Sequence, residues 1–315
     1  GRGGDERGHQ AAAAVSAPGA GRGGGAFVPR PLVGILLMMA AASLFPVLTG
    51  IAKLLSERYA SEQVIWARNA SHLVFVLVLF WPGRGLSLLR AQRPLVQVAR
   101  SLVLLMSTVC AFVAVKHIAL GKAATIQFVT PFIVTLLACA FLGERLVLAR
   151  GAAVCAGFLG VVVVIRPGVD SFQWWDLLPL AGASFYAAYQ VLTRFVAGKD
   201  SPETSVVYSA LVGTAAMTVF LPFGWTTPVD AFDAVVMASF GILGGIGHYC
   251  LARAMRHAEA SVISPFNYWQ IVGSSLFGFA VFGEVPDRYV WIGAALIVAA
   301  GIFMAWQERR GGVAA

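Results

Sequence analysis

Residues 138–146 read ACAFLGERL and residues 278–287 read GFAVFGEVPD, so an apolar run ends in Gly-Glu twice, 140 positions apart. The same shift of 140 aligns further pairs without a gap: Phe45 with Phe185, Pro82 with Pro222, Cys110 with Cys250, and Lys116-His117 with Arg256-His257. Because the matches are spread widely, they indicate one apolar unit present twice. The alternative is that biased composition produces the matches by chance.

The composition predicts that most of the surface faces lipid. Hydrophobic residues make up 58% of the 315 residues and charged residues only 12%, whereas soluble domains average about 25% charged residues. The net charge of +8 does not indicate nucleic acid, since the basic residues lie between apolar runs and form no stripe with interleaved aromatics. We therefore expect a lipid bilayer and no nucleic acid as partner.

Nothing in the sequence indicates a metal site or a cofactor. The four cysteines lie inside apolar runs without a CxxC pair, so they read as small hydrophobic residues. No Gly-rich phosphate loop is present. The spans also lack a nucleophile and base set, so we expect no enzyme.

Ten apolar runs approach the roughly 20 residues that a transmembrane helix needs. They lie near 32–52, 62–82, 96–115, 120–142, 148–166, 176–197, 204–224, 231–252, 258–283 and 288–306. The predicted fold class is an all-α membrane protein with ten transmembrane helices. We divide the chain into a disordered cytoplasmic tail, a first repeat, a linker, a second repeat and a cytoplasmic tail: 1–31, 32–166, 167–175, 176–306 and 307–315.

The basic residues predict the orientation. Of the 23 Lys and Arg, fifteen fall on the side of the N-terminus, six fall on the other side, and Arg68 and Arg100 lie within spans. The positive-inside rule then places both termini in the cytoplasm. Five spans per repeat is an odd number, so the second repeat is inverted relative to the first. Two inverted five-helix repeats are typical of carriers that work by alternating access.

The doubled Gly-Glu, each followed by a small-residue span (GAAVCAGFLGVVVVIRPG at 151–168 and GAALIVAAGIFMAW at 293–306), resembles the paired EamA domains of the drug/metabolite transporter superfamily. The resemblance covers about 32–306. It implies a ten-helix carrier of the bacterial inner membrane without ATP-binding parts, and it favours export. Members move amino acids, riboflavin-like vitamins, nucleoside derivatives and siderophore-like compounds, so the resemblance leaves the substrate open.

Polar residues within spans usually face the protein interior or a wet cavity. The shift of 140 aligns Gln127 with Asn267 and Thr130 with Gln270. The residues of each pair are three apart, so they share a helix face, and together they predict a substrate path. The alternative is hydrogen bonding between helices.

Other candidates surround these pairs. Pro131 and Pro265 interrupt the same two spans and either shape the cavity or are simply tolerated kinks. Tyr186, Gln190 and Tyr268 suit an amphipathic ligand, although core packing is the alternative for each aromatic. Glu144 and Glu284 are candidates for bonding helix ends or basic groups and for gating.

Arg68 and His72 are four residues apart and share a face of the second span. Arg68 either snorkels to the interface or faces inward, where it favours a carboxylate or phosphate. His248 either gates transport by titrating or donates to a nearby carbonyl.

These observations predict a secondary transporter for a small amphipathic organic metabolite, such as an amino acid or a vitamin-like compound. A channel or a non-transporting scaffold is the alternative, although the sequence shows no motif for a ring of charged residues or a filter of backbone carbonyls. The sequence leaves a monomer and a homodimer open.

Overall fold

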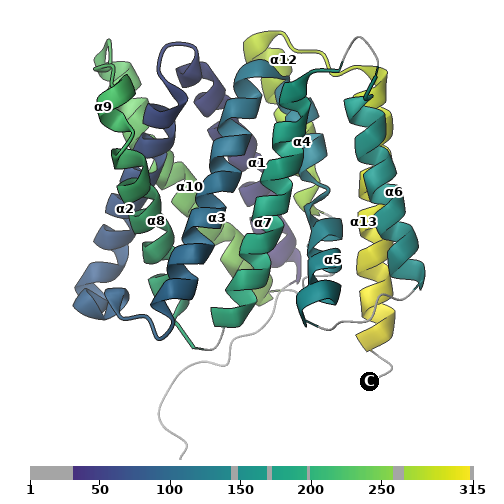
Figure 1. The fold of residues 1–315 in the computed structure, drawn as a ribbon, viewed down its shortest axis with the longest axis horizontal. Coiled ribbons are helices and arrows are strands. Elements are labelled where there is room, and N and C mark those ends of the chain that lie inside the picture. The colour runs from purple at the N-terminus through teal and green to yellow at the C-terminus, as the bar shows by residue number, and fades with distance from the viewer. Residues whose placement is uncertain (1–30, 143–147, 169–171, 197–198, 258–265, 313–315) are drawn as a thin grey trace, which may run out of the picture.

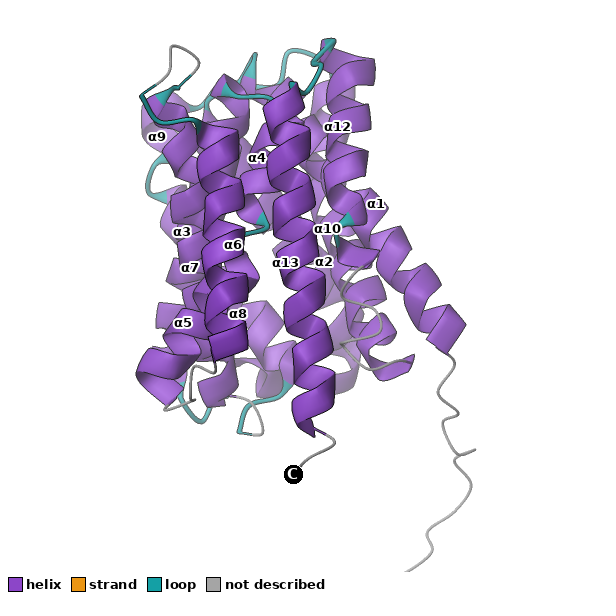
Figure 2. Ribbon diagram, turned by 90° about the vertical axis from the view of Figure 1, so that its right-hand side faces the viewer, coloured by secondary structure: helices purple, strands orange, loops and turns teal. Residues whose placement is uncertain are grey.

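A computed structural model describes residues 31–142, 148–168, 172–196, 199–257 and 266–312. These residues form a bundle of helices that run roughly side by side (Figures 1 and 2), and no strand occurs within these ranges. The first helix begins and the last helix ends at the same end of the bundle. We call this the lower end, as it is drawn in Figure 1, and the opposite one the upper end.

The first half of the bundle runs from residue 31 to residue 165. It comprises α1 (Pro31–Ser56), α2 (Ser61–Arg84), η1 (Gly85–Leu89), α3 (Pro94–His117), α4 (Leu120–Gln127), α5 (Thr130–Leu142) and α6 (Leu148–Ile165). The second half comprises η2 (Trp174–Asp176), α7 (Leu177–Val196), α8 (Pro202–Thr218), α9 (Leu221–Gly224), α10 (Ala231–His257), α12 (Trp269–Phe282) and α13 (Arg288–Gly312).

Several helices are long and apolar enough to cross a membrane, so the chain is a multi-pass membrane protein. The described ranges hold six such spans: Leu32–Ser56, Ser61–Leu89, Pro94–His117, Leu120–Phe141, Ala231–Leu251 and Arg288–Gln307. Gly151–Ile165 and Trp269–Phe282 are shorter apolar helices. The expected spans 176–197 and 204–224 correspond to α7 and α8, which are helical but are not among the six.

The helices of the two halves pack in a pattern that repeats when the halves are exchanged. Under the shift of 140, helices α1, α2 and α3 correspond to α7, α8 and α10. The packing of α1 on α10 therefore matches the packing of α7 on α3, and the packing of α2 on α10 matches that of α8 on α3. Helices α6 and α13, which occupy matching positions in the two halves, lie side by side (Figures 1 and 2). The internal similarity of the sequence is therefore matched by a similarity of contacts.

Close approach of α2 and α10 depends on Gly241. A Cβ atom at this position would overlap the backbone of Ser71 and His72, so a larger residue would push the two helices apart. The Gly241 N–H donates to the Ser71 hydroxyl at 2.8 Å. This contact fixes α2 against α10 one turn from Arg68.

Both halves contain a helix interrupted at the same place. The expected span 120–142 is two helices, since α4 ends at Gln127 and α5 begins at Thr130. In the second half the helix is interrupted at Tyr268, directly before α12. Tyr268 is the residue that the shift of 140 aligns with Phe128, the first residue after α4. The two breaks thus have equivalent positions in the repeat.

Candidate functional site

The break in the first half follows from Pro131, which has no N–H to donate to the carbonyl four residues earlier. That carbonyl belongs to Gln127, and the Thr130 hydroxyl donates to it at 2.7 Å instead. The Thr130 side chain is buried. The carbonyl that the proline leaves open therefore has a partner from its own chain segment.

The Gln127 side chain extends toward α7. Its Oε1 atom lies 3.4 Å from the place where a Cβ atom of Gly182 would be. Cys110 and the Ser107 carbonyl of α3 lie against the same glycine, and the Ser107 hydroxyl donates to the Gly182 carbonyl at 2.8 Å. The small residue on α7 thus makes room for an amide at the junction of α3, α4 and α7.

In the second half, the Gln270 amide donates to Asn267 Oδ1 across the break. Tyr268 points the other way, because its hydroxyl lies where a side chain on Gly301 of α13 would be. The Tyr268 ring is 5.0 Å from the Phe128 ring, centroid to centroid. The two equivalent break residues therefore contact each other, and the two helix breaks meet.

The structure does not join all the residues expected to form one site. No hydrogen bond links Gln127 to Asn267 or Gln270 within the described ranges. Glu144, Pro265 and the side chain of His248 lie outside the described part of the protein.

One face of α7 connects the first break to Arg68. Gly182, Tyr186 and Gln190 follow one another at intervals of four residues, so they share a face. The Tyr186 ring stacks on Tyr189, with centroids 5.5 Å apart and planes 23° apart. Gln127 contacts this helix at Gly182, and Arg68 approaches it at Tyr186.

Arg68 is directed into the bundle. Its Nη1 donates to the Thr108 hydroxyl of α3 at 3.4 Å, and its guanidinium lies 5.8 Å from the centre of the Phe112 ring. It is also close enough to Tyr186 to interact electrostatically with the phenol. Within the described ranges Arg68 forms no ion pair.

A second arginine within a span, Arg100 of α3, was not among the candidate site residues. Only 2% of it is exposed, and its guanidinium lies over Tyr189 at 5.0 Å. Its N–H groups donate to the following acceptors: Gln97 Oε1 at 3.2 Å, Thr193 Oγ1 at 3.4 Å, the Ser205 carbonyl and Ser209 Oγ at 3.0 Å. Arg100 and Tyr189 border a pocket of about 630 Å³ near the lower end.

At the upper end, Glu284 joins the two halves. Gly283 takes a left-handed conformation (φ 68°) that ends α12 and turns the chain back. Glu284 Oε2 then accepts the N–H of Leu120, the first residue of α4, at 2.9 Å. Its other carboxylate oxygen accepts from Lys53 of α1, whose ammonium also donates to the Ile118 carbonyl at 3.0 Å. The second Gly-Glu thus caps a helix of the first half.

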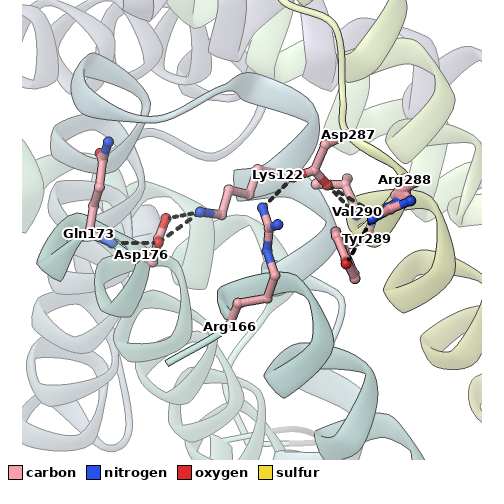
Figure 3. Close-up of polar contacts among 8 residues, drawn as sticks. All are labelled: Lys122, Arg166, Gln173, Asp176, Asp287, Arg288, Tyr289 and Val290. Atoms are coloured by element: carbon pink, nitrogen blue, oxygen red, sulfur yellow. Dashed lines mark hydrogen bonds and ion pairs between the residues drawn. The ribbon is translucent and has the colours of Figure 1, made fainter. Parts of the chain in front are cut away.

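Two further ion pairs lie at this end (Figure 3). Lys122 of α4 lies 2.7 Å from the carboxylate of Asp176, which is fully buried in η2. Arg166, after α6, pairs with Asp287, which also caps α13 by accepting the N–H groups of Tyr289 and Val290 at 3.0 and 2.9 Å. The upper ends of α4, α6 and α13 are therefore held by charged contacts.

Other chemistry is not indicated in the part of the chain that the structure describes. No group of three or more His, Cys, Asp or Glu side chains there is placed to hold a metal ion. A pocket of about 400 Å³ between α1, α12 and α13 is lined mainly by apolar side chains, among them Trp269 and Trp291.

An apolar helical bundle made of two matched halves, with interrupted helices that meet between them, defines a multi-pass membrane protein of the repeat-built transporter class. The sequence model of the EamA-like transporter family matches residues 32–166 and again residues 173–306. The chain belongs to this family, which is part of the drug/metabolite transporter superfamily.

Relatives with different substrates resemble the chain to a similar degree. A riboflavin transporter of Rhizobium johnstonii is 29% identical, over 89% of this chain and 93% of its own length. A pseudopaline exporter of Pseudomonas aeruginosa is 27% identical, over 88% and 97%. An S-adenosylmethionine uptake transporter of Rickettsia felis is 25% identical, over 82% and 88%. One crystal structure superposes with a TM-score of 0.62 at 21% identity, over 89% and 98%, which shows a shared fold.

Proposed function

We propose that this protein is a secondary transporter that moves a small amphipathic organic metabolite, an amino acid or a vitamin-like compound, across the bacterial inner membrane by alternating access. The observation that carries the proposal is the contact between the two helix breaks, Phe128 against Tyr268. Interrupted helices at a repeat interface are where secondary transporters bind substrate, because the breaks leave backbone and side-chain polar groups for a ligand.

Ten spans arranged as two inverted five-helix repeats underlie the mechanism. Two observations support this arrangement: the helix contacts repeat when the two halves are exchanged, and the family model matches each half of the chain. In it, one repeat takes the outward shape while the other takes the inward shape, and the two shapes are then exchanged. The lower end, where α1 begins and α13 ends, is the cytoplasmic side, as the excess of Lys and Arg favours.

Residues from both halves line the substrate path. In the first half these are Gln127 and Thr130 with Arg68, His72, Tyr186 and Gln190 nearby. In the second half they are Asn267, Tyr268 and Gln270, and His248 lies on α10. Pro131 and Pro265 shape the cavity. Riboflavin, S-adenosylmethionine and pseudopaline, which the relatives carry, support a polar organic substrate, and export is favoured by the family resemblance.

In this mechanism Glu284 closes the upper end. Its contacts with Lys53 and the first turn of α4 hold α1, α4 and α12 together. These contacts break when the upper end opens. Glu144, the equivalent residue of the first half, forms the corresponding gate at the lower end. A carboxylate that alternates between partners provides a gate without a cofactor.

Counterflow in proteoliposomes tests the proposal. The purified protein is reconstituted with one member of a panel of amino acids, flavins, nucleosides and organic cations inside, and uptake of the labelled compound is measured. We expect saturable exchange for one class. Gln127→Ala and Asn267→Ala are expected to lower it at least about tenfold, since each removes hydrogen bonds to the substrate.

Ser184→Ala is a suitable control, because its exposed hydroxyl bonds only the Leu180 carbonyl of its own helix. Exchange that is unchanged in Gln127→Ala and Asn267→Ala would remove these residues from the path. Absence of exchange for every compound, with protein that melts cooperatively, would favour a non-transporting scaffold. Passive flux without saturation would favour a channel.

A further inference from the structure

Arg68 has more hydrogen-bond donors than the described part of the protein supplies acceptors for. A guanidinium carries five N–H groups and remains charged in proteins. In the described ranges it donates only to the Thr108 hydroxyl, at the long distance of 3.4 Å. The Phe112 ring at 5.8 Å offers its face but no lone pair. Most of the donors of Arg68 thus have no acceptor among the residues that the structure describes.

None of the carboxylates in the described ranges pairs with Arg68. Those in ion pairs contact other cations near the ends of the bundle: Asp176, Glu203, Asp233, Glu284 and Asp287. Asp200 accepts from Gln92 and Gln97 near the lower end. A cation inside an apolar bundle without a counter-charge is unfavourable, and such residues usually mark a substrate or ion pathway.

The surroundings of Arg68 provide the remaining parts of a binding site. Tyr186 lies within electrostatic range of the guanidinium and stacks on Tyr189. One turn away on the same face of α7 is Gly182, against which the Gln127 amide lies. Four helical residues correspond to about 6 Å. Arg68 and Gln127 therefore neighbour two positions of α7 that are one helical turn apart, and one of these positions carries an aromatic ring.

We propose, on the basis of the function proposed above, that the substrate carries an oxyanion group that Arg68 binds. The group is a carboxylate or a phosphate, since both match the fork of a guanidinium with two parallel hydrogen bonds. The organic body of the substrate lies along Tyr186, and Gln127 bonds a polar atom at its other end. Arg68 is the residue that makes the carrier prefer substrates with the oxyanion group over analogues that lack it.

Matched pairs of compounds that differ in one charged group test this inference. One pair is riboflavin and riboflavin 5′-phosphate, and the other is an aromatic amino acid and its amide. Binding to the full-length protein in detergent is measured by thermal stabilisation, and uptake by counterflow. The first pair reports a phosphate and the second a carboxylate. We expect the member that carries the phosphate or the carboxylate to bind about 10- to 100-fold more tightly in one of the two pairs.

Arg68→Gln is expected to abolish this preference, so that both members of the pair bind with similar affinity. Arg68→Lys is expected to keep a weaker preference, since it retains the charge and loses the fork. The matched control is Arg84→Gln, which removes an arginine from an exposed pair with Glu203 at the lower end. The control is expected to retain the full preference of the wild type.

Three results would overturn the inference, and they distinguish it from the proposed transport function. Saturable transport with equal affinity for both members of each pair would overturn the role of Arg68 and leave the proposed transport function standing, as would a preference that persists in Arg68→Gln. Absence of binding and exchange for the whole panel by folded protein would overturn the proposed function and the inference with it.

Discussion

Arg68 and Arg100 lie on neighbouring helices, and their surroundings differ. Arg100 donates to four oxygen atoms from α3, α7 and α8 and is 2% exposed. Among the described residues Arg68 donates to one hydroxyl, at 3.4 Å. A cation whose hydrogen bonds are made within the protein stabilises the fold, whereas one whose donors remain open is suited to a ligand. The two roles are distinguished by the hydrogen-bond acceptors around each arginine, and not by its burial alone.

The largest effect on stability is expected from Arg100→Met. The substitution leaves the Ser205 carbonyl and the Ser209 hydroxyl, among others, without their donor in the interior. We expect the free energy of unfolding to fall by about 3 kcal/mol or more, since hydrogen bonds to a charged group each contribute about 1.5–3 kcal/mol. Unfolding in mixed micelles measures the change, with Arg84→Met as control. A wild-type unfolding curve for Arg100→Met would remove the distinction between the two arginines.

Arg68→Met is expected to lower transport without lowering stability. Replacing an uncompensated cation by an apolar side chain of similar length is neutral or stabilising, so the unfolding curve should stay in place or shift to higher denaturant. Counterflow should fall at least about tenfold, because the substrate loses its charged partner. The two measurements are made on the same preparation. A loss of stability like that of Arg100→Met would show that Arg68 is structural.

A smaller change in stability, dependent on pH, is expected from the Asp200 carboxylate, which interacts with Arg100. Burial acts to raise the pKa of the Asp200 carboxyl, but hydrogen bonds from Gln92 N–H and the Gln97 amide, with the charge of Arg100, hold its pKa below the usual value of 3.8. The stabilisation is therefore present above about pH 4 and is lost as the pH falls through the lower folded-state pKa.

Melting temperatures measured between pH 5 and pH 2.5 test this linkage. The wild type should lose slightly more stability on acidification than Asp200→Asn, which has no carboxylate to protonate. Equal slopes for the two proteins would show that Asp200 does not support the lower end near Arg100.

The smallest effect is expected from Thr108→Val. The hydroxyl of Thr108 is the one acceptor for Arg68 in the described ranges, and the distance of 3.4 Å indicates a weak bond. We expect the free energy of unfolding to change by less than about 0.5 kcal/mol, with substrate affinity retained. Loss of substrate binding in Thr108→Val would instead show that the Thr108 hydroxyl is needed to position the Arg68 guanidinium.

The sequence predicted the features that depend on composition and repetition. The membrane character and the helical class follow from the apolar runs, and the family follows from the resemblance of the two Gly-Glu segments to EamA domains; the structure and the comparisons confirm them. Pro131 also signalled the interruption at Phe128. The count of ten spans and the inversion remain part of the proposed function.

Contacts between distant segments could not be predicted. Arg100 has partners on α7 and α8, up to 109 positions away, and hydropathy periodicity does not tell which helices are neighbours. Gln97, one turn before Arg100, was a signal, because two polar side chains on one face of a span indicate a polar interface. The Lys53–Glu284 pair joins residues 231 positions apart, and only the fold brings them together.

The cap that Glu284 places on α4 also bears on the order of assembly. The capping carboxylate lies 164 positions after the N–H that it accepts. A ribosome therefore delivers α4 to the bilayer long before it makes Glu284, and the first turn of α4 initially lacks this partner. The first half reaches its finished form only after the second half has been inserted, so the two repeats, although alike in sequence, are not independent folding units.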